Sequence, residues 1–266
     1  MARKHGPQLE RLDAVAASNG LIAVGGHRDV SSIEATQVHI FDRRGELKTS
    51  VDFETSIVAL AFILEDILVA GTSDGRLIGC AVTGSTSKSL FDVSVHQGAV
   101  RALCTDALRR RLWSVGDDGM LASFDVQGAK LEPSGAPVRA SDSPLYALAV
   151  DREGRRLATA GADGQARIFT TAAIAEGPQR TTPIGEGELF SLAFADDGRL
   201  VAGGGDGSIR IVYVEGAPDE QDRTGDQAHK GAVRGLMFGP ALVDANDKPK
   251  PRRLFSIADD GELRAW

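Results

Sequence analysis

Short apolar runs alternate with small and polar residues along nearly the whole chain, and one arrangement recurs. Each copy has an apolar strand ending in small residues, then an Asp-Gly pair, then another short apolar run. Because Gly tolerates the positive φ of a tight hairpin, each Asp-Gly pair predicts a turn between two strands. The clearest copies are Leu68–Gly75, Leu112–Gly119, Leu157–Gly164, Leu200–Gly207 and Leu254–Gly261.

The spacing of these turns is regular. The turn aspartates are 44, 45, 43 and 54 residues apart, and the last step contains a polar insertion at Asp244–Arg253. An apolar run such as Leu145–Val150 precedes each copy and is typical of a strand buried on both faces. Four short strands per unit, repeated every 40–45 residues or so, predict the blades of an all-β propeller.

A less regular first unit, with Leu21–Gly26 as its second strand, brings the number of units to six. We therefore expect residues 1–266 to form a single propeller domain. The predicted blade units are about 8–53, 54–95, 96–140, 141–184, 185–228 and 229–266.

Polar residues at fixed places in two units resemble the WD-repeat family. In that family, a His before the inner strand, a Ser or Thr on the second strand, the turn Asp and a Trp on the third strand form one hydrogen-bonded network. The sixth unit matches with His229, Ser256, Asp260 and Trp266, and the third with His96, Ser114 and Asp118.

A His, a Ser and an Asp also suggest a catalytic triad. Because two units repeat the same set, we interpret it as structural: it satisfies polar groups whose unpaired burial costs about 1–3 kcal/mol each.

The closure of the propeller is open to two interpretations. Trp266 belongs to the third strand of the last unit, so the outer strand of that blade is missing from the sequence. An open sheet edge is a liability, and we expect a chain that continues beyond residue 266 in a seven-bladed ring. The alternative is a six-bladed ring closed by the N-terminal residues.

The sequence also limits where in the cell the protein is expected. The first residues lack the apolar core of a secretory signal, and no run of about 18 apolar residues predicts a membrane span. The two cysteines, Cys80 and Cys104, lie in strand-like runs and are interpreted as small buried hydrophobes in a reducing compartment. We expect a cytoplasmic protein with no membrane association.

One position of each inner strand is a candidate binding site. By the WD-repeat resemblance, the residue after the leading apolar position lines the mouth of the central channel. Aromatic and Arg side chains are typical of interface hot spots, and an acidic or phosphorylated peptide between Arg101 and Arg234 is one hypothesis. The alternative is that these side chains only cover the channel end. The positions are Asp13, Val58, Arg101, Tyr146, Phe190 and Arg234.

Basic residues gather in the turns predicted on the opposite face. The net charge of −7 argues against general coating of nucleic acid, but this local charge suits a nucleic-acid backbone or an acidic partner. Solvated turn charges are the simpler interpretation. The residues are Arg43, Arg44, Arg109, Arg110, Arg111, Arg152, Arg155, Arg156, Lys248, Lys250, Arg252 and Arg253.

Catalytic motifs do not stand out from the sequence. The five histidines show no metal-ligand spacing, and Gly203–Gly207 is a strand-to-hairpin turn, without the helix that a phosphate-binding loop requires. We therefore predict a non-enzymatic scaffold for a protein or peptide partner, with no catalytic residue, cofactor or metal. A nucleic-acid-associated propeller that binds through the basic turns is the alternative.

Overall fold

The structure is a computed structural model of the chain. It describes residues 11–18, 20–27, 36–64, 66–83, 86–106, 110–185, 187–212, 214, 224–225, 228–239, 242–243, 249–250 and 252–266. These residues form two compact units, 1–113 with 123–134 and 114–122 with 135–266.

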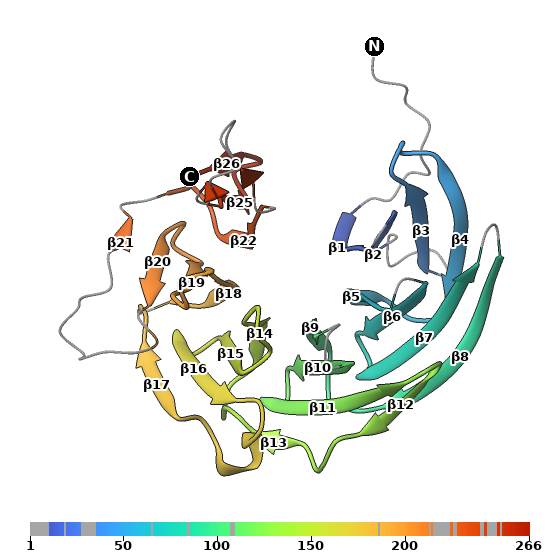
Figure 1. Ribbon diagram of the computed structural model, residues 1–266, viewed down its shortest axis with the longest axis horizontal. Helices are drawn as coiled ribbons and strands as arrows, with labels where there is room; N and C mark the ends of the chain where they lie inside the picture. Colours follow the sequence, from blue (N-terminus) through green and yellow to red (C-terminus); the bar gives the residue numbers. More distant parts are fainter. Residues whose placement is uncertain are drawn as a thin grey trace. The chain divides into compact units, whose positions relative to one another are not determined.

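Antiparallel sheets follow one another along the chain, each built from strands that are consecutive in sequence (Figure 1). In the first unit, blade 1 and blade 2 each have four strands in sequence order. Blade 1 contains β1 (Arg11–Ala17), β2 (Leu21–His27), β3 (Thr36–Asp42) and β4 (Leu47–Phe53). Blade 2 contains β5 (Ile57–Ile63), β6 (Ile67–Thr72), β7 (Arg76–Thr83) and β8 (Thr86–Ser94).

Blade 3 contributes strands to both units. Its sheet has the order β12-β11-β10-β9, and a short strand, β13, also pairs with β11. The strands are β9 (Val100–Asp106), β10 (Arg111–Gly116), β11 (Met120–Gln127), β12 (Lys130–Pro133) and β13 (Val138–Arg139).

The second unit contains the remaining blades. Blade 4 contains β14 (Leu145–Val150), β15 (Arg156–Gly161), β16 (Gln165–Thr170) and β17 (Arg180–Pro183), with a 3₁₀ turn at Ile174–Glu176. Blade 5 contains β18 (Leu189–Phe194), β19 (Leu200–Gly204), β20 (Ile209–Val212) and β21 (Thr224–Gly225). Blade 6 contains β22 (Val233–Phe238), β25 (Leu254–Ala258) and β26 (Leu263–Ala265), and its insertion holds β23 (Leu242–Val243) and β24 (Pro249–Lys250).

The prediction of an all-β chain with six consecutive blades is confirmed. The seven-bladed ring stays a prediction. Residues 28–35 of the first unit, where an insertion was predicted, lie outside the described residues.

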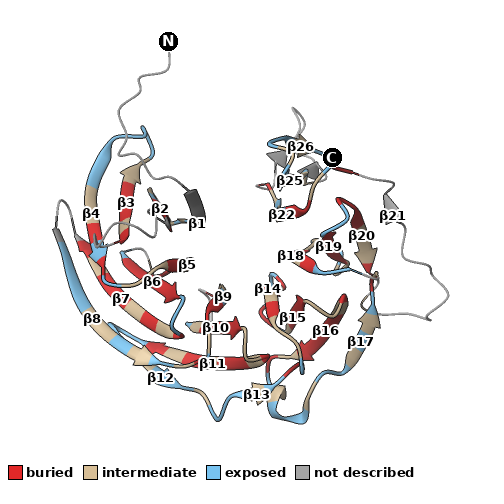
Figure 2. Ribbon diagram, turned by 180° about the vertical axis from the view of Figure 1, so that it is seen from behind, coloured by how far each residue is buried: buried red, intermediate tan, exposed pale blue. Residues whose placement is uncertain are grey.

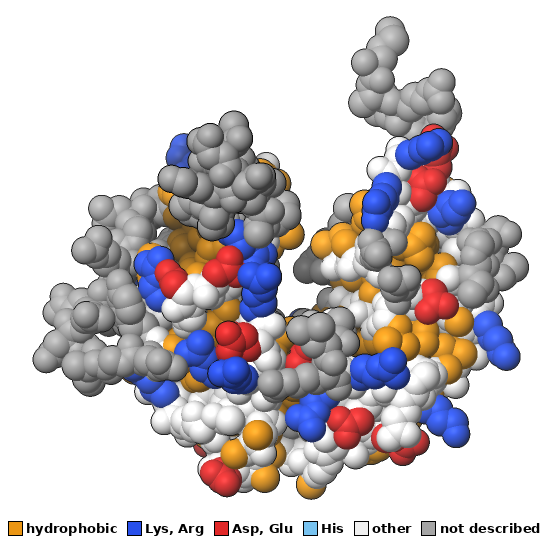
Figure 3. Space-filling model, viewed as in Figure 1, with side chains coloured by type: hydrophobic (Ala, Val, Ile, Leu, Met, Phe, Trp, Pro, Cys, Tyr) orange, Lys and Arg blue, Asp and Glu red, His pale blue; other side chains and the backbone are white. Residues whose placement is uncertain are grey.

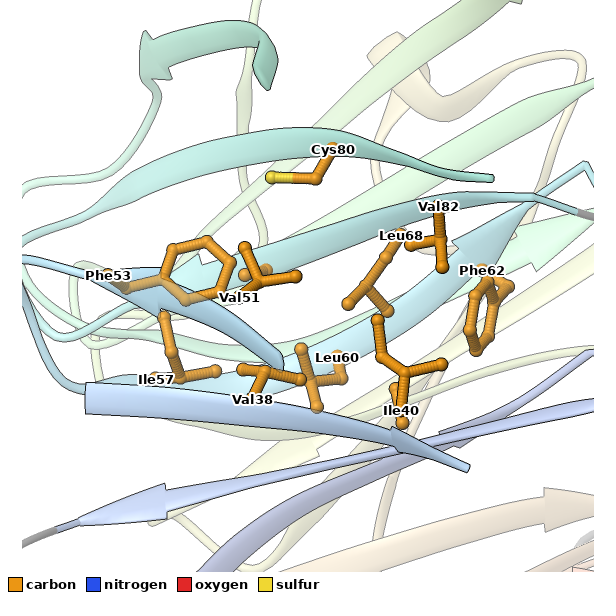
Figure 4. Packing of buried hydrophobic residues seen from close by; sticks show 12 residues of the cluster. Val38, Ile40, Val51, Phe53, Ile57, Leu60, Phe62, Leu68, Cys80 and Val82 are labelled. Atoms are coloured by element: carbon orange, nitrogen blue, oxygen red, sulfur yellow. The ribbon is translucent and has the colours of Figure 1, made fainter. Parts of the chain in front are cut away.

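Neighbouring blades bury their apolar faces against each other. In the first unit, Val38 and Ile40 of blade 1 share a core with Ile57, Leu60 and Leu68 of blade 2 (Figure 4). In the second unit, a similar core joins blades 4 and 5. In Figure 2 the outer strands β8 and β12 are largely exposed or intermediate in burial, whereas the inner strands of the same blades carry most of the buried residues.

Candidate interaction site

The candidate binding residues occupy β-bulges. In five inner strands the pairing with the second strand skips one residue, and the skipped residue is the predicted one in every case. A bulge leaves the extra residue unpaired and redirects its side chain. The skipped residues are Asp13, Val58, Tyr146, Phe190 and Arg234.

Three of these side chains come together in the second unit. The rings of Tyr146 and Phe190 stack, with 5.4 Å between centroids and 12° between planes. The guanidinium of Arg234 lies over the Phe190 ring, 4.0 Å from the ring centroid. Figure 1 shows their strands β14, β18 and β22 side by side. We call this set the Tyr146–Phe190–Arg234 surface.

Two carboxylates border this surface. Arg234 donates to both oxygens of Asp259, with Nη2 to Oδ2 at 2.8 Å and Nε to Oδ1 at 2.9 Å. The hydroxyl of Tyr146 donates to Oε1 of Glu188 at 3.4 Å. The Asp259 hydrogen bonds raise the pKa of Arg234, so its charge is fixed and largely compensated.

The sequence interpretation missed Glu188 and Asp259. A signal existed for Asp259: it comes just before the turn aspartate, at the place that Asp117 has in blade 3. The contact with Arg234 could not be seen, because it depends on the bulge.

The other predicted positions belong to the first unit. Val58 is half-buried and Arg101 is exposed at the second position of β9. The side chain of Asp13 lies outside the described residues. Within the second unit, the described contacts bring Tyr146, Phe190 and Arg234 together.

Most of the described arginines in the basic turns have a carboxylate partner. Asp196 accepts from Arg252 at 2.8 Å and lies 3.9 Å from Arg152. Figure 3 shows the mixture on one face, where blue and red side chains are interspersed. Further pairs are Arg155–Glu153 at 3.2 Å, Arg156–Asp151 at 3.1 Å and Arg111–Asp125 at 3.1 Å.

Seven other residues of the predicted basic set remain. Arg43, Arg44, Arg110 and Arg253 are exposed, Arg109 and Lys248 lie outside the described residues, and Lys250 is described only in its backbone.

The polar network of blade 6 is complete. His229 lies with Nδ1 3.0 Å from Oδ2 of Asp260 and with Nε2 2.7 Å from Oγ of Ser256. That same oxygen accepts from Nε1 of Trp266 at 3.0 Å. Because the Asp260 carboxylate can only accept, Nδ1 of His229 carries the hydrogen that it donates to Asp260; in the neutral ring Nε2 then accepts from the Ser256 hydroxyl.

The turn aspartate of this network is strongly acidic. The backbone N–H of Lys230 donates to Asp260, and with the N–H of Glu262 and the His229 ring it lowers the pKa of that carboxyl to about 2.

The corresponding residues of blade 3 are split between the units. His96 is buried in the first unit, and Ser114 is buried in the second. Asp118 accepts the N–H of Met120 at 3.0 Å.

Blades 4 and 5 replace the histidine with other groups. Ser141 stands at the His position of blade 4 and donates to Asp163 at 3.2 Å, while Arg167 binds the same carboxylate. In blade 5 that position is Gly185, and the guanidinium of Arg210 occupies the space above it while binding Asp206. Both arginines follow their turn aspartate by four residues.

Neither a metal cluster nor a membrane span is found in the part of the chain that the structure describes. No group of three His, Cys, Asp or Glu side chains there could hold a metal ion, and no helix there could cross a membrane.

Comparison with known families agrees with this geometry. The family described as "WD domain, G-beta repeat" matches residues 136–170 and 178–212. These two segments are WD repeats. The two matched repeats contain Tyr146 and Phe190, and each begins before the inner strand of blade 4 or blade 5.

Curated relatives match parts of this chain. Protein hir-1 of Neurospora crassa is 32% identical in an alignment of 142 residues that covers 47% of this chain and 14% of that protein. Telomerase protein component 1 of Rattus norvegicus is 22% identical over 81% of this chain and 8% of its own length. The chain thus spans only a small part of these relatives.

Among solved structures, one propeller covers nearly the whole chain. It is the crystal structure of Chaetomium thermophilum Sqt1 bound to the N-terminus of the ribosomal protein L10. The TM-score is 0.74 at 19% identity, over 96% of this chain and 71% of that one. At this identity the likeness shows the fold alone.

Proposed function

We propose that this WD-repeat chain is a non-enzymatic scaffold of the cytoplasm that binds a protein or peptide. The binding site is the Tyr146–Phe190–Arg234 surface, and its stacked geometry is the observation that carries the proposal. Bulges in three consecutive blades present two aromatic rings and a guanidinium together. Aromatic and Arg side chains are the most frequent hot-spot residues of protein interfaces.

The charges around this surface modify the expected ligand. Since Asp259 compensates Arg234, stacking on the rings and hydrogen bonding to Glu188 and Asp259 contribute more to recognition than a free positive charge. This compensation makes the surface of the second unit less suited to an acidic peptide, the first hypothesis from sequence.

The solved neighbour supports a peptide partner. Sqt1 was crystallised with the N-terminus of a ribosomal protein, so a propeller of this fold accepts an extended chain end. We propose the same class of partner for this chain.

Nucleic acid is the second candidate partner. Binding to a nucleic-acid backbone requires several cations that neutralise phosphates. In the second unit, Arg152, Arg155 and Arg156 instead form ion pairs with Asp196, Glu153 and Asp151. This arrangement favours the protein partner.

Affinity capture tests both candidates. Wild type is compared with Tyr146→Ala/Arg234→Ala and with Arg152→Ala/Arg155→Ala as a matched control on the basic turns, each with and without nuclease. We expect one defined partner that survives nuclease, is retained by the control and is lost by the first variant. Loss in the control variant, or after nuclease alone, would refute the proposal and assign binding to the basic turns.

A further inference from the structure

A hollow of about 400 Å³ lies between blades 1 and 2, wholly within the first unit. It is formed by the outer strand β4 of blade 1 and by β7 and β8 of blade 2. It is separate from the Tyr146–Phe190–Arg234 surface, which belongs to the other unit. The lining residues are Val51, Asp52, Phe53, Glu54, Arg76, Ile78, Cys80, Ser87, Ser89 and Asp92.

The hollow coincides with a missing aromatic side chain. Six residues after the turn aspartate, blades 3, 4 and 6 carry Phe124, Phe169 and Trp266. Blade 2 carries Cys80 at this place. Blade 5 carries Val212 there. A thiol is far smaller than a phenyl or indole ring, so the position in blade 2 leaves space that an aromatic side chain fills in blades 3, 4 and 6.

No neighbouring ring can occupy that space from within blade 2. Phe91, on the neighbouring strand β8, packs over Gly79, where a Cβ atom would meet its ring at 2.2 Å. Successive residues of a strand point to opposite faces, so Phe91 covers the face away from Cys80. Figure 4 shows Cys80 near Val51 and Phe53, the residues that blade 1 contributes to the shared core.

The floor and the rim of the hollow differ in chemistry. Val51, Phe53 and Ile78 give an apolar floor, and burial raises the pKa of the Cys80 thiol, which keeps it uncharged. The volume falls within the roughly 300–1,000 Å³ of small-ligand sites. Polar or charged residues make up more of the lining than apolar residues do.

Carboxylates dominate the rim. The lining contains Asp52, Glu54 and Asp92 but only one cation, Arg76. That cation is bound by Asp92 at 2.7 Å and also by Asp74 at 2.9 Å. The charge at the rim is therefore negative, and a cationic group is the complement.

We propose that this hollow is a binding site for an aromatic ring joined to a cationic group. The ring occupies the space of the missing aromatic side chain, against Cys80 and Ile78, and the cation faces Asp52 and Glu54. A free aromatic amine and an aromatic residue next to Lys or Arg in a peptide share this chemistry.

Calorimetric titration with two probes distinguishes these sources. Tryptamine represents the free amine and the dipeptide amide acetyl-Trp-Lys-NH₂ represents the peptide. Cys80→Phe fills the hollow with the chain's own ring, whereas Cys80→Ala keeps it open. We expect Cys80→Ala to keep the affinity for the bound probe and Cys80→Phe to weaken it by about tenfold or more. In Cys80→Phe the new ring already fills the hollow, and forcing a second ring into it is costly.

Charge recognition is tested with Glu54→Gln. This variant should weaken tryptamine binding and leave binding of neutral indole unchanged. A thiol measurement covers the case in which Cys80→Phe does not fold: in a Cys104→Ser background, saturating tryptamine should slow N-ethylmaleimide modification of Cys80. Equal affinity in folded Cys80→Phe, unprotected modification, or no binding of either probe to wild type at about 10 mM overturns the proposal.

Discussion

The buried hydroxyls Ser256 and Thr159 stand at the same place in blades 6 and 4, four residues before the turn aspartate. Ser256 has two partners, the His229 ring and the Trp266 indole. Thr159 is fully buried and its Oγ1 has no partner among the described residues. The difference arises because the short Ser141 replaces histidine in blade 4 and binds Asp163 instead.

The two hydroxyls should respond oppositely to removal. Ser256→Ala breaks two buried hydrogen bonds, and we expect a loss of about 1–3 kcal/mol in the free energy of unfolding. Thr159→Val exchanges an unpaired hydroxyl for a methyl of similar shape and should be neutral or stabilising. Urea unfolding measures both. Equal losses would show that the blade 6 network adds nothing to ordinary packing.

Asp206 makes stability depend on pH. Burial alone would raise the pKa of this carboxyl, but hydrogen bonds from Arg210 and Ser208 lower it to about 2. A folded-state pKa below the unfolded value of about 3.9 stabilises the fold at higher pH, and this contribution is lost as the pH falls from about 4 to about 2.

Asp206→Asn removes this titration. We expect the variant to be less stable than wild type near pH 6, with the gap closing toward about pH 2, as seen in urea midpoints. A gap that stays constant over this range would contradict the assignment.

At the scale of the element, the Asp-Gly turn joins each blade to the next. Gly207 of blade 5 accepts the N–H of His229 in blade 6 at 2.8 Å. A Cβ atom on Gly207 would lie 2.2 Å from the carbonyl oxygen of His229. The same close approach occurs at Gly75 to His96, Gly119 to Ser141 and Gly164 to Gly185.

Gly207 and Gly261 form a matched pair for this contact. Both have positive φ, +81° and +77°, but nothing lies within 4 Å of a Cβ placed on Gly261. An Ala at either position costs about 1–2 kcal/mol for the left-handed backbone, and Gly207→Ala adds a clash with the next blade. We expect Gly207→Ala to lower the unfolding midpoint clearly more than Gly261→Ala. Equal effects would mean that the turn glycine serves only its own hairpin.

Blade 6 has one apolar face without cover among the described residues. Met237 and Leu263 are 62% and 67% exposed, whereas Leu236, next in sequence to Met237, packs against the core of blade 5. Exposed apolar patches promote association.

Met237→Lys/Leu263→Lys should therefore reduce self-association, measured by light scattering against concentration, with the fold retained in circular dichroism. Leu236→Lys is the control and should unfold the blade. Unchanged scattering in the double variant would show that this face does not drive association.

For the whole molecule, the sequence predicted what is local and repeated. Asp-Gly pairs and apolar runs predicted the blades, and counting from Val233 and Leu145 predicted the positions of Arg234 and Tyr146. The bulges could not be predicted, because a skipped pair depends on how two strands are aligned. The pairing of Asp196 with Arg252 was also hidden, since the two residues are 56 positions apart.

That pairing leads to a prediction on overall charge. With a net charge of −7 and with Arg152, Arg155, Arg156 and Arg252 paired to carboxylates, the wild-type chain should bind a random DNA duplex more weakly than about 10⁻⁴ M at physiological salt. Asp196→Asn releases Arg152 and Arg252 and should strengthen binding, with a steeper salt dependence. Tight wild-type binding in a fluorescence anisotropy titration would contradict this prediction.

The joint made by the turn glycine has a consequence for how such chains diversify. Its acceptor is the backbone carbonyl of the turn glycine, and its donor is a backbone N–H of the next blade, from His96, Ser141, Ile184 and His229 in four successive cases. Because this contact between blades uses backbone atoms only, it does not depend on which side chain the next blade carries. A repeat can therefore be duplicated or exchanged without a matching mutation in its neighbour. Sequence drift at that position then leaves the assembly of blades intact, and the histidine network can survive in one blade while arginines replace it in others.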